Sequence, residues 1–162
     1  MSGFGHEKRV SDTVEWFTPP SVFEALKTTF DLDPASPGAD VVPWIPATRH
    51  LTKADNGLVK PWNGGVWLNP PYDENMVQWA TRFVKHGNGI WLSFARTDTQ
   101  WFRVLESKRV VLVLKPGRIK FVPGIPTANN DRPGAPSVFA AMGEKYITAV
   151  LQSGLGSCWR ML

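Results

Sequence analysis

The chain has 162 residues, of which 43% are apolar, which is enough to bury a core and too much for a disordered chain. Its net charge is +4, and the single cysteine, Cys158, excludes an internal disulfide and a cysteine-based zinc site. No apolar run approaches the roughly 20 residues that span a bilayer. We therefore expect no membrane partner, and the scarcity of cysteine fits a cytoplasmic location.

The N-terminal part of the chain is predicted to contain one helix. We expect a flexible polar segment over residues 1–14, followed by a single domain over residues 15–162. Thr18 is predicted to cap a helix over residues 21–30, because Pro19 and Pro20 suit a first helical turn. Taken alone, this segment is as consistent with an ordinary capped helix that has no role in a site as with a functional one.

A short strand over residues 31–33 is predicted to end at Asp33, followed by Pro34 and Ala35. In an open α/β sheet, ligands bind outside the carboxyl ends of the strands. Asp33 would there accept hydrogen bonds from a ribose or an amino group, or it would simply stabilise a turn before Pro34. No glycine-rich phosphate motif is present, so a nicotinamide or nucleoside-triphosphate site is not expected.

Residues 37–63 are rich in Pro, Gly, Asp and Asn and are predicted to form a long irregular loop. Asp55-Asn56-Gly57-Leu58 has the composition of a turn within that loop. Asp55 is therefore expected to stabilise this turn, and a contact with a ligand is the alternative.

The most informative stretch is Asn69-Pro70-Pro71-Tyr72. It follows the apolar run Val66-Trp67-Leu68 and precedes a helix predicted over residues 74–85. Each proline fixes its own φ and disfavours a helical conformation in the residue before it, so Asn69 is held extended at a strand end. A carboxamide oxygen, a free carbonyl and an aromatic face together suit a flat ring that carries an exocyclic amino group.

The remaining segments complete an α/β pattern. We expect a buried strand over 90–94, a helix over 99–107, a strand over 109–114, a half-exposed strand over 118–122, and a closing hairpin of strands over 137–142 and 146–152. The predicted fold is a mostly parallel sheet with this hairpin as its antiparallel edge.

Positive charge is concentrated in one part of the chain. Residues 96–132 hold eight Lys or Arg and three Asp or Glu, a balance of +5. Arg118 and Lys120 alternate with apolar residues and would share one face of a strand, where they could hold phosphates. The loop over residues 123–136 is a candidate DNA-facing loop. The alternative for both segments is a solvated surface.

Six motifs occur in a fixed order along the chain. They are Glu15-Trp16-Phe17-Thr18-Pro19-Pro20, Leu32-Asp33-Pro34-Ala35, Asp55-Asn56-Gly57-Leu58, Trp62 with Asn69-Pro70-Pro71-Tyr72, Ala95-Arg96-Thr97-Asp98-Thr99, and Gly117-Arg118-Ile119-Lys120-Phe121. In this order they resemble the phage-type Dam-like DNA N6-adenine methyltransferase family. The resemblance spans about residues 15–142.

This resemblance implies a Rossmann-like S-adenosylmethionine-dependent methyltransferase. The chain has no room for a separate target-recognition domain, and we expect no metal. It implies double-stranded DNA as substrate, in the cytoplasm of a bacterial host of a phage or prophage, and the protein as a monomer or weak dimer. The implied cofactor-binding residues are Trp16, Thr18, Pro19, Asp33, Pro34, Ala35, Asp55 and Asn69; the catalytic residues are Asn69, Pro70, Pro71 and Tyr72; the DNA-binding residues are Arg96, Arg118, Lys120 and Arg132. Unlike the broader class, this chain lacks a glycine-rich loop after Asp33.

Several functions share the Asn-Pro-Pro-Tyr motif, because each of them handles a planar amino group. A methyltransferase acting on N4 of cytosine, on RNA or on a protein amide is therefore an alternative. A non-catalytic DNA-binding module with a degenerate pocket is another. In the favoured interpretation, the target base is flipped out of the duplex before its amino nitrogen meets Asn69 and Pro70.

Overall fold

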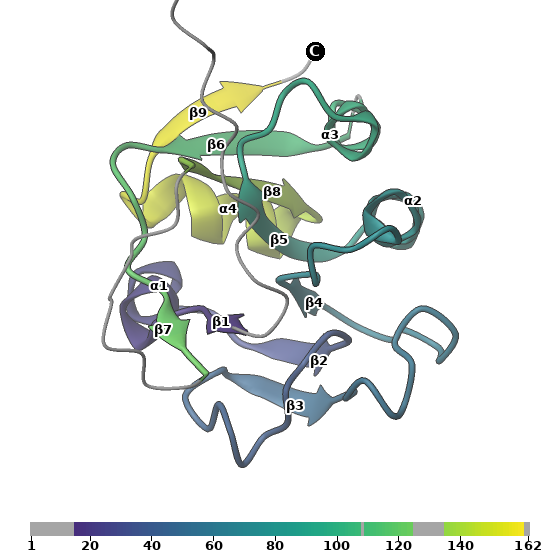
Figure 1. The fold of residues 1–162 in the computed structure, drawn as a ribbon. Coiled ribbons are helices and arrows are strands. Elements are labelled where there is room, and N and C mark those ends of the chain that lie inside the picture. The colour runs from purple at the N-terminus through teal and green to yellow at the C-terminus, as the bar shows by residue number, and fades with distance from the viewer. Residues whose placement is uncertain (1–14, 108, 125–134, 161–162) are drawn as a thin grey trace, which may run out of the picture.

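The computed structural model describes residues 15–107, 109–124 and 135–160. In chain order the elements are β1 Trp16–Phe17, α1 Pro20–Leu26, β2 Phe30–Asp33, β3 Ala47–His50, β4 Val66–Leu68, α2 Met76–His86, β5 Gly89–Phe94, α3 Gln100–Leu105, β6 Val111–Lys115, β7 Val122–Pro123, β8 Ser137–Met142, α4 Glu144–Gln152 and β9 Ser157–Arg160 (Figure 1). Within the described residues, seven strands form one sheet in the order β3-β2-β4-β5-β8-β6-β9. β1 and β7 form a separate two-stranded ladder.

The sheet is parallel in one part and antiparallel in the other. β3, β2, β4 and β5 pair in parallel, and β8 then runs antiparallel between β5 and β6. β9 pairs antiparallel with the other side of β6. The α/β class that the sequence predicts is therefore confirmed, and the sheet is mixed.

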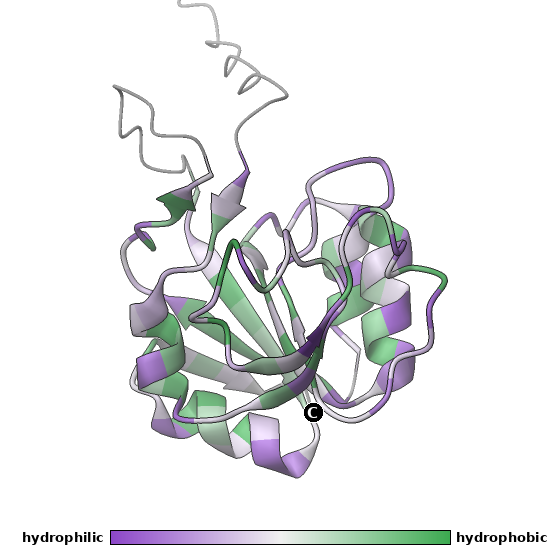
Figure 2. Ribbon diagram, turned by 90° about the horizontal axis from the view of Figure 1, so that it is seen from below, coloured by the Kyte–Doolittle hydropathy of each residue, from purple (hydrophilic) through white to green (hydrophobic). Residues whose placement is uncertain are grey.

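Helices cover both faces of the sheet because the buried strands are apolar on both sides. Val66 and Leu68 of β4 face the layer of α2 and α3, while Trp67 between them faces α1 and α4. Figure 2 shows the helices on either side of the sheet, with hydrophobic residues toward it and hydrophilic residues outward. On the α1 side, the Trp67 ring packs edge-on against Phe23, with ring centroids 4.7 Å apart.

The predicted closing hairpin is wrong. Residues 144–152 form α4, and the strand that the hairpin was to supply at the edge is replaced by β9. Tyr146 and Val150 lie four residues apart and are both buried, which is helical spacing. Aromatic and β-branched residues favour strands locally, but burial of this helical stripe against β8 decides the structure. β8 itself lies inside the sheet and not at its edge.

Four local predictions also need correction. β3 lies within the segment expected to be an irregular loop, and residues 118–121 do not form the expected strand, which is confined to β7. The N-terminal helix ends at Leu26 because Lys27 adopts a left-handed conformation, with φ of 48°, and Phe30 already belongs to β2. Pro19, and not Thr18, occupies the N-cap position of α1, and no side chain caps that helix.

Gly89 allows β4 and β5 to approach closely. A Cβ at this position would lie 2.2 Å from the Val66 carbonyl oxygen, in the residue with which Gly89 pairs. We expect Gly89→Ala to lower the free energy of unfolding by about 3 kcal/mol, because the strands must separate to relieve the clash and because the φ of 152° at Gly89 is one that residues with a side chain rarely adopt. Gly154→Ala is the control, since Gly154 has φ of 69° but open space around it, and we expect a loss of about 1 kcal/mol. Urea denaturation measures both, and equal losses would contradict the packing role of Gly89.

Candidate active site

The candidate site lies where the strand connections diverge. From β2 the chain continues to β3 on one side, and from β4 it continues to β5 on the other side, while β2 and β4 are themselves neighbours. In open α/β sheets, ligands bind at such a switch point, outside the carboxyl ends of the two strands. Asp33 ends β2 and Asn69 follows β4, so the structure brings both predicted residues to this edge of the sheet.

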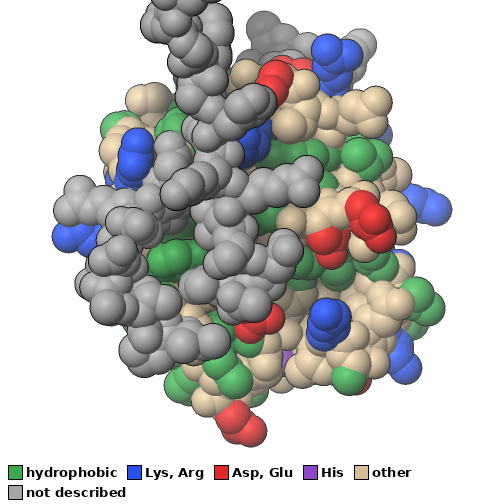
Figure 3. All heavy atoms as spheres, viewed as in Figure 1, with side chains coloured by type: hydrophobic (Ala, Val, Ile, Leu, Met, Phe, Trp, Pro, Cys, Tyr) green, Lys and Arg blue, Asp and Glu red, His purple; other side chains and the backbone are tan. Residues whose placement is uncertain are grey.

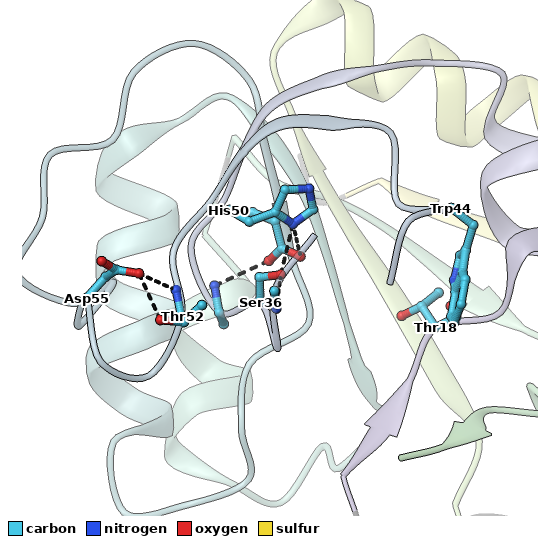
Figure 4. A network of polar contacts seen from close by, with 9 residues as sticks. Thr18, Ser36, Trp44, His50, Thr52 and Asp55 are labelled. Carbon is cyan, nitrogen blue, oxygen red and sulfur yellow. Dashed lines mark hydrogen bonds and ion pairs between the residues drawn. The ribbon is translucent and has the colours of Figure 1, made fainter. Parts of the chain in front are cut away.

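Asn69 is half-buried and is held by a residue far away in the sequence. Its side-chain Nδ2 donates a hydrogen bond to Thr18 Oγ1, at 3.3 Å. Thr18 is only 1% exposed, and its carbonyl oxygen accepts a 2.8 Å hydrogen bond from Trp44 Nε1. Figure 4 shows Trp44 beside Thr18. The carboxamide is thus fixed by its nitrogen, which leaves its oxygen as the end available to a ligand.

The two prolines after Asn69 differ in their surroundings. Pro70 is buried, whereas Pro71 is exposed and its carbonyl oxygen accepts a 3.0 Å hydrogen bond from the Asp73 amide. Among the described residues, no hydrogen bond ends on the Pro70 carbonyl oxygen or on Asn69 Oδ1. The turn therefore presents two neighbouring oxygen acceptors with free hydrogen-bonding capacity.

Tyr72 is fixed on one face and open on the other. Its ring stacks on Phe94 at the end of β5, with centroids 4.8 Å apart and planes 24° from parallel. Its hydroxyl oxygen accepts a hydrogen bond from the Phe94 amide, and burial of this hydroxyl raises the pKa of Tyr72 well above its usual value. The residue nevertheless remains 48% exposed, so the ring face away from Phe94 can receive another flat ring.

At the end of β2, a buried polar cluster forms around Asp33, which is 3% exposed. The Asp33 carboxylate accepts a 3.2 Å hydrogen bond from the Ala35 amide and lies 3.8 Å from Nδ1 of His50, at the end of β3. The same His50 nitrogen is hydrogen-bonded to Ser36 Oγ at 2.8 Å, and Ser36 also accepts a hydrogen bond from the Gly38 amide (Figure 4). The cluster fixes the turn that follows β2.

Burial disfavours charge in this cluster. It raises the pKa of Asp33 to about 7, although hydrogen bonds from Ala35 and Ser36 act in the opposite direction. Burial also lowers the pKa of His50. The Asp33 carboxyl therefore keeps its proton to a higher pH than an exposed aspartate does, and the His50 imidazole stays uncharged to a lower pH than an exposed histidine does.

The other predicted cofactor residues lie near the same edge or in the loop beside it. Asp55 is exposed, and its carboxylate accepts hydrogen bonds of 2.8 Å from both the amide and the hydroxyl of Thr52 (Figure 4). These hydrogen bonds lower the pKa of Asp55, and they support the turn-forming role. Trp16, Pro19 and Ala35 are half-buried, whereas Pro34 is buried.

The predicted phosphate contacts are only partly described by the structure. Arg96, Arg118 and Lys120 are exposed, while Ile119 between the last two is buried. Basic exposed and apolar buried side chains therefore alternate here as predicted, although the segment does not form a strand. Phe121 packs edge-on against Phe94, at 6.2 Å between centroids, which places this segment beside the Tyr72 site. On the face seen in Figure 3, Lys and Arg side chains are spread out and not gathered in one place. Arg132 and most of the loop over residues 123–136 lie outside the described residues.

The comparison with protein families gives one result. Residues 6–150 match the family model described as DNA N-6-adenine-methyltransferase (Dam). The chain belongs to this family. No curated protein and no solved structure matches the chain.

Within this Dam-family chain, sequence analysis missed three features of the site. They are the contact of Thr18 with Asn69, the position of His50 beside Asp33, and Phe94 as the support of Tyr72. His50 and Phe94 each end a strand, so recognising β3 and using the rule on strand ends would have marked both. No local signal links Thr18 to a residue 51 positions away.

Two features of the described residues bear on other functions. No three His, Cys, Asp or Glu side chains come together there as a metal site would require. In the same part of the Dam-family chain, none of the helices has both the length and the apolar character needed to cross a membrane.

The raised pKa of Asp33 predicts a pH dependence of stability. Because the folded pKa of about 7 lies above the unfolded value, the folded state holds the proton more tightly, and the free energy of unfolding falls as pH rises between the two values. Asp33→Asn cannot ionise and lacks this loss. We therefore expect its stability relative to the natural chain to increase by about 2 kcal/mol between pH 5 and pH 7. Denaturation curves across this range test the expectation, and parallel profiles of the two proteins would contradict it.

Proposed function

We propose that this chain transfers a methyl group from S-adenosylmethionine to the exocyclic N6 of adenine in DNA. The observation that carries the proposal is that Asn69 Oδ1 and the Pro70 carbonyl oxygen accept no hydrogen bond from the described residues. Tyr72, whose ring is partly exposed, follows two residues later. Membership in the Dam family supports DNA as the substrate and adenine as the base.

The order of the strands supports a Rossmann-like methyltransferase fold. β2, β4 and β5 run parallel side by side, and an antiparallel β8 is inserted before β6. A cofactor would lie in the crevice at the ends of β2 and β4. The residues there fit such a group: Trp16 and Ala35 offer half-buried apolar surface, and the Asp33 turn offers backbone and carboxyl groups for hydrogen bonds.

S-adenosylmethionine, when bound, would supply a methyl group on a positively charged sulfur, which is already activated for transfer. The chain then has to position the acceptor and has little acid–base work to do. The adenine amino nitrogen is a poor nucleophile because its lone pair is delocalised into the ring. Donating its two hydrogens to Asn69 Oδ1 and the Pro70 carbonyl oxygen would draw the nitrogen toward tetrahedral geometry and localise the pair.

Tyr72 would receive the flipped base. Taking a base out of the duplex costs a few kcal/mol, and stacking on an aromatic ring returns about 1 to 3 kcal/mol. Tyr72 is ready for this role because Phe94 supports the back of its ring and binds its hydroxyl. Little conformational freedom remains to be lost when the base arrives.

The exposed basic residues beside this site would contact the phosphate backbone. Arg96 lies two residues after Phe94, the last residue of β5, and Arg118 and Lys120 precede Phe121, which packs against Phe94. Lysine and arginine contacts to phosphates give affinity without base specificity and make binding salt-dependent. We propose double-stranded DNA as the partner on this side of the site.

Asn69→Ala tests the proposal by removing one of the two acceptors. We expect methyl transfer to DNA to fall by at least about 100-fold, the effect typical of losing one preorganised hydrogen-bond partner in a transition state. Binding of S-adenosylmethionine should survive, since the Asp33 turn and Trp16 remain. Transfer of a labelled methyl group to DNA measures the first quantity, and isothermal titration with the cofactor measures the second.

Asn63→Ala is the matched control. Asn63 is an exposed asparagine three residues before β4, so it lies beyond the opposite end of that strand from Asn69. This variant should transfer methyl groups at the rate of the natural chain. Near-normal turnover by Asn69→Ala would overturn the assignment of the pocket. A natural chain that binds DNA but no S-adenosylmethionine would instead indicate a non-catalytic DNA-binding module.

A further inference from the structure

A buried hydroxyl lies against the side chain on which the proposed chemistry depends. Thr18 is 1% exposed and does not cap α1, yet its Oγ1 accepts a hydrogen bond from Asn69 Nδ2. A buried hydroxyl without a partner is unfavourable compared with a methyl group of the same size. If Thr18 only filled apolar space, valine would be more favourable at this position, so we attribute a specific hydrogen-bonding role to the hydroxyl.

The two ends of the Asn69 carboxamide have nearly the same shape and opposite hydrogen-bonding character. With its oxygen toward the pocket, the side chain accepts a hydrogen bond from an amino group. With its nitrogen toward the pocket, the side chain places its own N–H donors against the N–H donors of the amino group, and no hydrogen bond forms. A threonine hydroxyl can donate or accept, so it could pair with either end. In the structure it accepts from the nitrogen at 3.3 Å, so the oxygen is the end left for a ligand.

We infer that Thr18 is a positioning residue, which holds the Asn69 carboxamide with its nitrogen inward and its oxygen toward the target amino group. This inference rests on the function proposed above and deepens it. Thr18 acts through Asn69, and the inferred role does not require the hydroxyl to touch the base or the cofactor.

Thr18 is itself held firmly enough to serve this purpose. Its carbonyl oxygen accepts a hydrogen bond from Trp44 Nε1, and Pro19 after it is fixed at φ −71° and ψ 154°. Before it, Trp16 and Phe17 of β1 pair with the two residues of β7. Thr18 is therefore anchored by the preceding ladder, by the following proline and by an indole from the loop before β3.

The test compares Thr18→Val, which keeps the shape and removes the acceptor, with Thr18→Ser, which keeps the acceptor. We expect Thr18→Val to lower kcat for methyl transfer about five- to tenfold, the effect of one neutral hydrogen bond, and Thr18→Ser to stay close to the natural chain. The resemblance implies a cofactor contact for Thr18, whereas the inferred role is to act through Asn69 from a buried position. The affinity for S-adenosylmethionine, measured by titration, should therefore be unchanged in both variants. In the Asn69→Ala background, Thr18→Val should cause no further loss, because the group on which it acts is absent.

A second measurement does not depend on activity. In amide NMR spectra of the free protein, the side-chain NH₂ signals of Asn69 should shift in Thr18→Val and exchange faster with water, while Thr18→Ser keeps them near their original positions. Unchanged Asn69 signals in Thr18→Val would overturn the inference, whatever the enzyme does.

The outcomes separate this inference from the function on which it rests. A natural chain without methyl transfer, but with the expected NMR shifts, would overturn the proposed function and leave the contact of Thr18 with Asn69 established. An active natural chain in which Thr18→Val keeps full kcat would overturn the positioning role alone. A loss of cofactor affinity in Thr18→Val, or an equal loss of kcat in the Asn69→Ala background, would show that Thr18 acts on the cofactor or the fold instead.

Discussion

The pairing of β2 with β4 is the constraint on which the site depends. Gly65 fixes this pairing through both of its backbone polar groups. Its carbonyl oxygen accepts hydrogen bonds from the Asp31 and Leu32 amides, and its own amide donates to the Asp31 carboxylate at 2.6 Å. Leu32 thereby stands opposite Val66. The chain leaves these two neighbouring strands in opposite directions, which is the arrangement at whose carboxyl ends ligands bind in open α/β sheets, and Asp33 and Asn69 both lie at that edge of the sheet.

The parts of the site that could be predicted from the sequence are those determined by a short run of consecutive residues. An apolar run, two prolines and a following amphipathic helix dictate a strand, a rigid turn and a helix without help from the rest of the fold. The position of Asn69 at a strand end and the open ring of Tyr72 both follow from this short stretch. The order of motifs then identified the family, which the family comparison confirms.

The parts that could not be predicted depend on contacts between distant segments. Thr18 looked like an N-cap because threonine before proline is typical of one, but the β1–β7 ladder and Trp44 hold it against Asn69 instead. Residues 146–152 were expected to form a strand, which their aromatic and β-branched residues favour, but a helical stripe packs them on β8 as part of α4. In both places tertiary packing outweighed a local preference.

The identity of the methylated base tests the proposed pocket most directly. Duplex DNA incubated with the natural chain and S-adenosylmethionine carrying a labelled methyl group would be digested to nucleosides and analysed by mass spectrometry. We predict the label in N6-methyldeoxyadenosine. Label confined to N4-methyldeoxycytidine, or no label in any nucleoside from a chain that binds both cofactor and DNA, would contradict the assignment of the Asn69 and Tyr72 pocket to adenine.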